Sequence, residues 1–378
     1  MQIEFRASAA PTLGIEVEVG IVDRATRALR PAAPDILAEI GSIFPEGVHP
    51  RAKPELLQCT IEVITGICKT VAEARADLEA TIAELDESVR SRDLALMCSG
   101  THPFSHWGDQ LVTENPRYSA LVETIGWPAR RLAIHGIHFH VGVPSGEHAV
   151  AIVGALTYHL PVFLALSASS PYWTGLDTAM ASCRTKVFEG LPTAGLPPRL
   201  RQWSDFEQVM STLMTAGVIS SIREIWWDIR PHPDFGTVEI RVCDGMATMS
   251  EVCALAALAQ CLVADLIDRI DTDRPVPGVS EWVVRENKWL AARFGLDAEL
   301  IIDDEGHRLP TRQVISDLLE ELQPVADRMH CRAELEHVRT IMDVGPSYQR
   351  QRAVVAGGGS LPDVVDTLIV EWEQGDLC

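Results

Sequence analysis

Several common signatures are missing from this sequence of 378 residues, and each absence removes a class of function. It contains no GxxxxGKS or GxxxxGKT segment, so it has no P-loop for nucleotide phosphates. No GxGxxG segment follows a strand-like run, which removes the dinucleotide-binding fingerprint. The nine cysteines include no CxxC pair, so neither a disulfide framework nor a thiolate zinc site is indicated.

Positive charge is also scarce. Lys and Arg total 32 against 53 Asp and Glu, which gives a net charge of −21. A field of this sign repels phosphate backbones and anionic lipid headgroups, so we expect neither nucleic acid nor a membrane surface as a partner. The same acidity suits a protein that binds cations. The first residues lack the apolar core of a signal peptide, and a reducing cytoplasm is therefore the expected location.

One stretch, residues 149–168, is apolar enough to raise the question of a membrane span. Tyr158, His159 and Pro161 interrupt it, and no cluster of Lys or Arg flanks it as membrane topology would favour. We therefore expect a buried helix here rather than a transmembrane one.

No repeat is visible, and the Pro- and Gly-rich segments 190–198 and 274–280 resemble surface loops rather than a domain boundary. We therefore expect a single domain over residues 1–378. Apolar residues at helical spacing predict five helices. They cover residues 71–89, the segment after Ser145, and residues 251–270, 311–327 (ending near Pro324) and 363–372.

Four short segments instead alternate apolar and polar residues with a period of two, as half-buried strands do. They are residues 14–22, 59–65, 136–143 and 237–243. Such alternation means that helices cover one face of the sheet while the other face is polar. This favours an antiparallel sheet and, with helices between the strands, predicts the α+β class.

The polar faces of these strands carry an unusual set of side chains. They offer Glu16, Glu18, Glu62, His138, His140, Glu239 and Arg241. Residues two apart on a strand point the same way, so each pair presents its groups side by side. On a single strand, such residues would most simply form a polar face exposed to solvent. Four strands with the same pattern instead predict a surface lined with metal ligands. Oxygen ligands in excess favour Mg²⁺ or Mn²⁺, while the His138–His140 pair leaves Zn²⁺ open.

Basic side chains that could bind phosphate or carboxylate groups are few. They are Arg184, Lys186, Arg230, Arg241, Arg285, Lys288, Arg350 and Arg352. Any one of them could equally be a structural ion-pair residue, although Arg is well suited to bidentate recognition of such anions. A nucleophile and base among Cys98, His102, Ser105 and His106 is not favoured, because no GxSxG elbow or triad spacing accompanies them. We expect a loop with hydrogen-bonding roles there.

Eight segments carry a further signal. They are Gly14-Ile-Glu-Val-Glu, Pro54-Glu-Leu-Leu-Gln-Cys-Thr-Ile-Glu-Val-Ile-Thr-Gly, Gly100-Thr-His-Pro-Phe, Gly136-Ile-His-Phe-His-Val-Gly-Val, Trp226-Trp-Asp-Ile-Arg-Pro, Thr237-Val-Glu-Ile-Arg-Val-Cys-Asp, Arg285-Glu-Asn-Lys-Trp and Gln349-Arg-Gln-Arg. Taken in this order, from about residue 12 to about residue 372, they resemble the bacterial carboxylate–amine ligase family, the second type of glutamate–cysteine ligase. The resemblance implies a glutamine-synthetase-like catalytic fold: a curved antiparallel sheet whose polar face forms the active-site funnel, with helices over the other face.

The resemblance also implies roles for individual residues. Glu16, Glu18, Glu62, His138 and Glu239 match metal-ligand positions; Arg184 and Arg241 match catalytic positions that contact the acid substrate or the transferring phosphoryl group; Glu55, His140, Arg230 and Arg285 are expected to bind substrate. The first segment often reads Glu-Glu-Glu in relatives, whereas Val17 stands in its middle here. Position 17 points to the covered face, so we expect no lost ligand.

The implied reaction joins a carboxylate, typically the γ-carboxylate of glutamate, to an amine such as that of cysteine. ATP would phosphorylate the carboxylate to an acyl phosphate, which the amine attacks, with Mg²⁺ or Mn²⁺ bridging the phosphates. An acyl phosphate must be kept from water, so the loops at residues 100–118 and 190–205 are candidate covers. The resemblance also suggests a homodimer.

Two alternatives are compatible with the same residues. A zinc hydrolase that uses His138, His140 and a Glu would bind zinc stoichiometrically and turn over without nucleotide. A non-catalytic binding protein on the same scaffold would bind ligand without releasing ADP. The full set of acids, imidazoles and guanidiniums argues against a non-catalytic protein, because a site without catalytic function would tolerate the loss of some of them.

Overall fold

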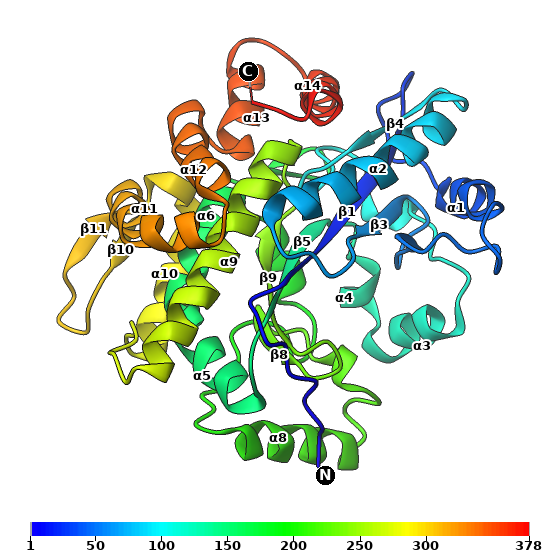
Figure 1. The fold of residues 1–378 in the computed structure, drawn as a ribbon. Coiled ribbons are helices and arrows are strands. Elements are labelled where there is room, and N and C mark those ends of the chain that lie inside the picture. Colours follow the sequence, from blue (N-terminus) through cyan, green and yellow to red (C-terminus); the bar gives the residue numbers. More distant parts are fainter. Residues whose placement is uncertain (1, 378) are drawn as a thin grey trace.

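The structure, a computed structural model, describes residues 2–377 and is shown in Figure 1. Its strands are β1 (Leu13–Asp23), β2 (Ala52–Pro54), β3 (Thr60–Ile64), β4 (Leu94–Met97), β5 (Gly136–Gly142), β6 (Tyr172–Trp173), β7 (Leu176–Asp177), β8 (Ile229–His232), β9 (Thr237–Asp244), β10 (Glu299–Ile301) and β11 (Arg308–Pro310). Its α-helices are α1 (Ala33–Gly41), α2 (Val71–Arg90), α3 (Pro116–Ile125), α4 (Trp127–Arg130), α5 (Gly146–Leu156), α6 (Leu160–Ser167), α7 (Arg184–Phe188), α8 (Trp203–Thr215), α9 (Met249–Asp271), α10 (Glu281–Phe294), α11 (Thr311–Arg328), α12 (Arg332–Val344), α13 (Ser347–Ala356) and α14 (Leu361–Gln374). Short 3₁₀ turns are η1 (Trp107–Asp109), η2 (Thr157–His159), η3 (Ile222–Glu224) and η4 (Gly295–Asp297).

A seven-stranded sheet runs through the molecule in the order β2-β3-β1-β5-β9-β8, with β4 paired to the last residues of β1. Every pairing between these strands is antiparallel. The register sets Glu18 opposite Glu62 and Glu16 opposite His138. This confirms the α+β class and the antiparallel sheet expected from the period-two segments.

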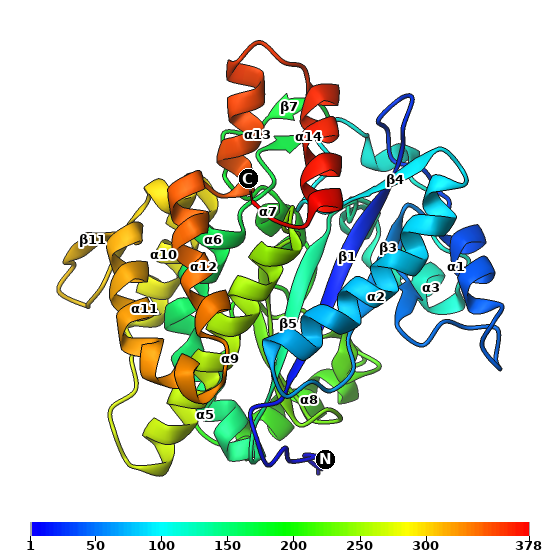
Figure 2. The ribbon, with the colours of Figure 1, turned by 45° about the horizontal axis from the view of Figure 1, so that its top comes forward.

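Alternation within the strands separates an apolar face from a polar one. In β1, Ile15, Val17 and Val19 are at most 1% exposed, and Glu16 and Glu18 between them point to the other side. Helices α2, α5, α6 and α9 contact the sheet strands, and Figures 1 and 2 show α2 and α9 lying across the sheet. The side chain of Val17 packs in this core, as expected for position 17.

Two helical segments, Gly146–Ser167 and Met249–Asp271, are long and apolar enough to span a membrane by length and composition alone. In the structure, 78% and 89% of their apolar windows are buried inside the protein, and both segments pack against the sheet. The buried helix expected after Ser145 is therefore confirmed. It is broken, however, because η2 separates α5 from α6, and Pro161 lies in the first turn of α6.

The helix expected over residues 311–327 is confirmed as α11, but it does not end near Pro324. The helix α11 continues through Pro324 to Arg328. A proline inside a helix removes a backbone hydrogen bond and costs about 3 kcal/mol. Leu322, Val325 and Ala326 around it are buried, and α11 packs against α9 and α12. Burial of apolar side chains at roughly 1.5–3 kcal/mol for each large one offsets the cost, so packing decides where this helix ends.

The segment after β4 has the structural role expected for it. His102 is 2% exposed; its Nε2 lies 2.8 Å from the carbonyl oxygen of Arg27, and its Nδ1 lies 2.9 Å from the backbone nitrogen of Ser105. An imidazole that donates from Nε2 and accepts at Nδ1 is neutral. Burial lowers the pKa of His102 to about 3, which maintains that neutral form at physiological pH.

Arg350 connects α13 to two other helices. Its guanidinium pairs with Glu251 in the first turn of α9 and with Glu371 on α14. Glu251 is 1% exposed and also forms the capping box of α9 with Thr248. Arg352, further along α13, pairs instead with the exposed Asp177. Both arginines therefore have structural partners.

We expect Arg350→Met to lower the free energy of unfolding by about 3–5 kcal/mol, because it leaves the buried carboxylate of Glu251 without its cation. Arg352→Met is the matched control: it breaks an exposed ion pair and should cost less than about 1 kcal/mol. Urea denaturation followed by circular dichroism measures both losses. Equal losses in the two variants would contradict the assignment of Arg350 as a buried structural link.

The neutral state of His102 predicts a pH dependence of stability. The pKa of His102 is 6.5 in the unfolded chain and about 3 in the folded protein. Between these pH values, the unfolded chain therefore binds a proton that the folded protein does not bind. Stability is therefore lost as the pH falls from 6.5 toward 3, by up to about 1.4 kcal/mol per pH unit. His102→Gln lacks this slope, although lost hydrogen bonds should destabilise it at pH 7. Its deficit relative to wild type, from urea denaturation, should shrink as the pH falls; a constant deficit would refute the prediction.

Candidate active site

A cavity of about 1080 Å³ opens on the polar face of the sheet. Its floor comes from β1, β3, β5, β8 and β9, and its walls come from residues 117–134, 184–193 and 217–226. The predicted site residues that line it are Glu16, Glu18, Glu55, Glu62, His138, His140, Arg184, Arg230, Glu239 and Arg241. The sheet thus brings together in one cavity residues that lie far apart in the sequence.

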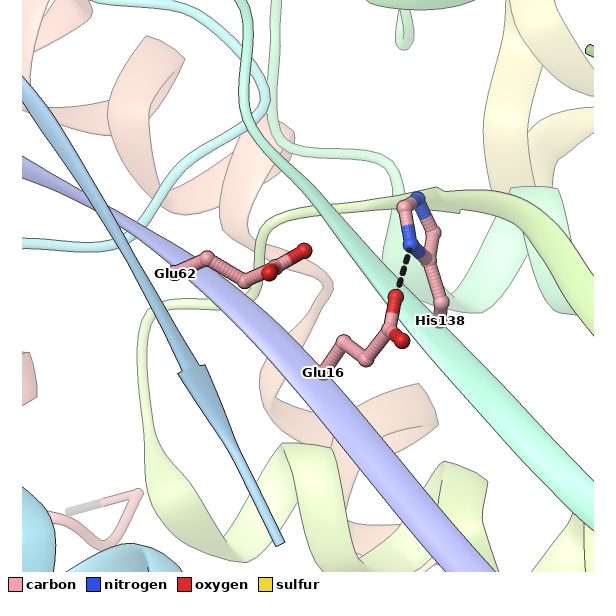
Figure 3. A group of neighbouring side chains, drawn as sticks. All are labelled: Glu16, Glu62 and His138. Atoms are coloured by element: carbon pink, nitrogen blue, oxygen red, sulfur yellow. Dashed lines mark hydrogen bonds and ion pairs between the residues drawn. The ribbon is translucent and has the colours of Figure 1, made fainter. Parts of the chain in front are cut away.

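The first candidate cation group, here called the β1–β3–β5 group, consists of Glu16, Glu62 and His138. Ligand atoms from these three residues lie within 4.8 Å of one another, and Nδ1 of His138 is 2.9 Å from Oε2 of Glu16. Figure 3 shows the two carboxylates, from adjacent strands, and the imidazole converging on a common space. Two carboxylates and one imidazole form a set that can hold a divalent cation.

The second candidate group, here called the three-carboxylate group, consists of Glu18, Glu55 and Glu62, again within 4.8 Å. Glu18 follows Glu16 by two residues on β1, and Glu55 directly follows β2. Oε2 of Glu18 accepts a hydrogen bond from the backbone nitrogen of Gly136 at 2.5 Å. Glu62 belongs to both groups, so two bound cations would share its carboxylate.

Electrostatics in the three-carboxylate group favour a bound cation. Burial, and after it the carboxylate of Glu55, raises the pKa of Glu18 to about 8. Burial, with Glu16 and Glu55, also raises the pKa of Glu62 well above its ordinary value. The guanidinium of Arg184 lowers the pKa of Glu18, and that of Arg241 lowers both pKa values, but they offset the upward shifts only in part. A divalent cation would stabilise all these carboxylates in the ionised form, so the donor set fits one.

Two members of the β1–β3–β5 group, Glu16 and His138, have the protonation states that a metal needs. Burial would raise the pKa of Glu16, but His140 and His138 outweigh it, and the pKa of Glu16 is lowered. Burial and the charge of Arg241 lower the pKa of His138 to about 4. At neutral pH, Glu16 is therefore an ionised carboxylate and His138 a neutral imidazole, as metal binding requires.

A third candidate group joins Glu16 to His140 and Glu239. Nε2 of His140 lies 3.2 Å from Oε1 of Glu16. Glu239 is already paired, with Arg230 at 2.5 Å and with Arg241. Burial opposes the ionisation of Glu239, but the two guanidiniums outweigh it and lower its pKa well below the ordinary value. The two guanidiniums compete with a cation for the oxygens of Glu239, which favours the first two groups as cation sites.

Arg184 adds a further guanidinium to the cavity. It is the first residue of α7 and is 3% exposed. A Cβ at position 136 would overlap its guanidinium, so this close approach requires Gly136. Nη1 lies 3.5 Å from the carbonyl oxygen of Val242, and within residues 2–377 the buried Nε has no hydrogen-bond partner. The protein therefore satisfies the hydrogen-bonding groups of this guanidinium only in part.

Among residues 2–377, Arg285 lies outside the cavity lining, which contradicts its expected role as a substrate-binding residue. Its side chain is 72% exposed and pairs with Glu281, one turn earlier on α10. The same segment turns Asn287 and Lys288 into the protein, where they are 4% and 3% exposed. With about 3.6 residues per turn, Asn287 lies on the opposite side of α10 from Arg285, which a match of sequence letters does not show.

Several lining residues were not predicted. Arg117 and Tyr118 come from α3, which carries no strand-like periodicity. His232 and Phe235 lie at and after the end of β8, with their rings stacked 4.1 Å apart. The alternation of apolar and polar residues in Ile229-Arg-Pro-His is a usable strand signal. The edge position of β8 in the sheet tolerates Pro231.

Comparison with known proteins places these residues in a family. Residues 12–366 match the model of Glutamate-cysteine ligase family 2. The chain belongs to that family. A Frankia casuarinae protein that carries a provisional glutamate–cysteine ligase 2-1 name is 52% identical over 376 residues, which cover 99% of this chain and 98% of the relative. A Thermobifida fusca protein with a provisional glutamate–cysteine ligase 2 name is 49% identical, over 99% of this chain and 94% of the relative.

Solved structures share the fold of this family member. A crystal structure of glutamate–cysteine ligase from Francisella tularensis, in complex with AMP, has a TM-score of 0.71 at 13% identity and covers 98% of this chain and 90% of that one. A bifunctional glutathione synthetase from Pasteurella multocida has a TM-score of 0.69 at 12% identity and covers 96% of this chain and 52% of that one. The expected ligase fold is thereby confirmed. As a member of its family, the chain is an ATP-dependent carbon–nitrogen ligase, and neither alternative function is favoured.

Glu16 belongs to two of the three candidate cation groups, so we expect Glu16→Gln to weaken Mn²⁺ binding by more than about tenfold. Glu281→Gln is the matched control, because it removes a similar charge from an exposed position on α10 where solvent ions screen it. Isothermal titration calorimetry measures both affinities. If Glu16→Gln bound Mn²⁺ as tightly as wild type, the cation groups would be wrong.

Proposed function

We propose that this ligase joins the γ-carboxylate of glutamate to the amine of cysteine or of another small amine, in the cytoplasm, with ATP and with Mg²⁺ or Mn²⁺. The observation that carries the proposal is the division of the cavity into two sides. The β1–β3 side presents carboxylates, while β8, β9 and α7 present guanidiniums, together with Glu239, which pairs with two of them. ATP phosphates with bound cations suit the first side, and a substrate carboxylate or transferring phosphoryl group suits the second.

Cations would be held by the β1–β3–β5 group and the three-carboxylate group. The donors are carboxylate oxygens and one imidazole nitrogen, a set that suits Mg²⁺ or Mn²⁺ better than Zn²⁺. Bound there, the cations would bind oxygens of the ATP phosphates and offset their negative charge. The raised pKa values of Glu18 and Glu62 support this assignment, because the protein supplies too little positive charge to balance these carboxylates.

Arg184 and Arg241 would bind the acid substrate or the γ-phosphoryl group. Arg241 is held by Glu239, whose other oxygen binds Arg230. Nη1 of Arg230 in turn donates to the carbonyl oxygen of Ile225 at 2.6 Å. Arg230 thus orients Glu239, and Glu239 orients Arg241. Donors fixed in this way stabilise the charge that develops during phosphoryl transfer, typically by about 10²–10³-fold in rate.

The chemistry follows from the weakness of a carboxylate as an electrophile. An oxygen of the substrate carboxylate attacks the γ-phosphorus of ATP, ADP leaves, and an acyl phosphate forms. The amine then attacks the acyl carbon, phosphate leaves, and the nitrogen loses a proton to give the amide. Arg184 and Arg241 would bind the phosphoryl oxygens through both steps, since these oxygens stay anionic throughout.

Both segments expected to cover the site reach the cavity. Arg117 and Tyr118 line it from the end of one, and Leu191, Pro192 and Thr193 line it from the other. Closure of these segments over the substrates would keep water from the acyl phosphate. That closure stays a prediction, as does the homodimer.

The deciding experiment measures ADP release by the purified protein with ATP and Mg²⁺, across a matrix of amino acids offered as acid and as amine. We expect release to require one acid and to rise with one amine, which identifies both substrates. Arg184→Ala should lower kcat/KM by at least about 100-fold, because it removes a guanidinium that binds the reacting groups. Arg285→Ala is the matched control and should behave as wild type.

Two outcomes would reject the proposal. One is no nucleotide turnover with any pair of acid and amine. The other is hydrolysis that depends on stoichiometric zinc and needs no ATP, which would restore the hydrolase alternative. An Arg285→Ala defect as large as that of Arg184→Ala would place the substrate site elsewhere.

A further inference from the structure

One buried cation has no part in the proposed chemistry. Lys288 on α10 is 3% exposed. Its Nζ lies 2.5 Å from Oδ2 of Asp228 and 2.7 Å from Oε1 of Glu189. Burial would lower the pKa of Lys288, but the two carboxylates outweigh it and raise that pKa, so the amine is charged. Two acids from different elements therefore meet at one ammonium group.

Glu189 caps the short helix that begins with Arg184. That helix, α7, is too short to be stable by itself. The long helix α10 holds both of its ends. The carbonyl oxygen of Ala292 accepts a hydrogen bond from the backbone nitrogen of Ser182 just before α7, at 2.9 Å, and Lys288 binds Glu189 just after it. The position of Arg184 therefore depends on α10.

Asp228 lies directly before β8, in the strand pair that carries Arg230 and Arg241. Its carbonyl oxygen accepts a hydrogen bond from the backbone nitrogen of Arg241 at 2.8 Å. Its own backbone nitrogen donates to the carbonyl oxygen of Gly195 at 2.7 Å. The carboxylate of Asp228 is buried and needs a cation to balance it, and Lys288 supplies that cation.

We propose that Lys288 is a positioning residue of the ligase site. By binding Glu189 and Asp228 at once, it fixes the helix that presents Arg184 relative to the strand that presents Arg241. The inference rests on the proposed function, since it takes these arginines to bind the acid or the transferring phosphoryl group. Within residues 2–377, Lys288 lies outside the cavity lining and therefore acts through the arginines.

At Glu189, the contacts distinguish this role from simple neutralisation of an acid. Lys186 binds the other oxygen of Glu189, with Nζ 2.9 Å from Oε2, so Glu189 has a cation without Lys288. Lys288 in addition binds Asp228, so its ammonium group links Glu189 to Asp228. Loss of that link would let the two guanidinium-bearing elements move apart, and a shift of about 1 Å at reacting groups can cost about 100-fold in rate.

The test compares Lys288→Met with Lys186→Met, which removes the exposed cation from the same carboxylate. A double variant, Lys288→Met with Asp228→Asn, breaks the link without leaving an unpaired buried charge, and so separates the positioning role from misfolding. Lys288→Arg keeps the charge and the link. Three quantities are measured on each full-length protein: kcat for ADP release, Mn²⁺ affinity, and backbone hydrogen exchange over residues 184–195.

We expect Lys288→Met and the double variant to lose about 100-fold in kcat per folded molecule, to exchange faster over residues 184–195, and to keep wild-type Mn²⁺ affinity. Lys288→Arg should recover much of the lost kcat, and Lys186→Met should match wild type in all three quantities. A near wild-type kcat per folded molecule in the double variant would overturn the proposal.

Failure of the proposed function is recognised separately. If the wild-type protein releases no ADP with any acid and amine, the ligase chemistry fails, yet hydrogen exchange still tests the link made by Lys288. Faster exchange over residues 184–195 in both Lys288 variants would then support the link. Unchanged exchange would overturn it.

Discussion

The rest of the structure depends on a strand in which carboxylates alternate with side chains of the hydrophobic core. In β1, Glu16 and Glu18 alternate with Ile15, Val17 and Val19. Because side chains on a strand alternate with a period of two, a register slip of one residue would turn the carboxylates into the core and the valines into the cavity. The helices that cover the apolar face therefore also determine which groups face the cavity. Stability of the fold and composition of the site are set by the same packing.

Charge is divided across the polar face that results. On one side, Glu239 is balanced by Arg230 and Arg241, and its pKa is lowered. On the other side, burial and mutual repulsion raise the pKa values of Glu18 and Glu62. Where carboxylates have too little positive charge around them, a bound cation is stabilised. Where guanidiniums gather, a bound anion is stabilised. A ligase that uses a nucleotide and a carboxylate substrate needs both conditions next to each other.

Much of this arrangement could be predicted from the sequence, because period-two alternation names the residues on each face of a strand without knowledge of the tertiary structure. The helical parts were harder. Arg285 was assigned from the letters of its segment, whereas the buried face of α10 turns Lys288 inward. The end of α11 depended on packing around Pro324 rather than on local preference. The walls at residues 117–134 and 217–226 approach the sheet through long-range contacts, which local patterns do not encode.

An irregularity at His138 also lies beyond sequence patterns, and it bears on the choice of metal. The register between β5 and β9 shifts between Ile137 and Phe139, and such bulges re-aim side chains near active sites. His138 joins Glu16 and Glu62, whereas His140 joins Glu16 and Glu239; no candidate cation group among residues 2–377 contains both imidazoles. A zinc hydrolase of the kind considered for an HxH pair needs both imidazoles on one ion. The strand instead distributes them between two sets of carboxylates, which favours oxygen-rich sites for Mg²⁺ or Mn²⁺.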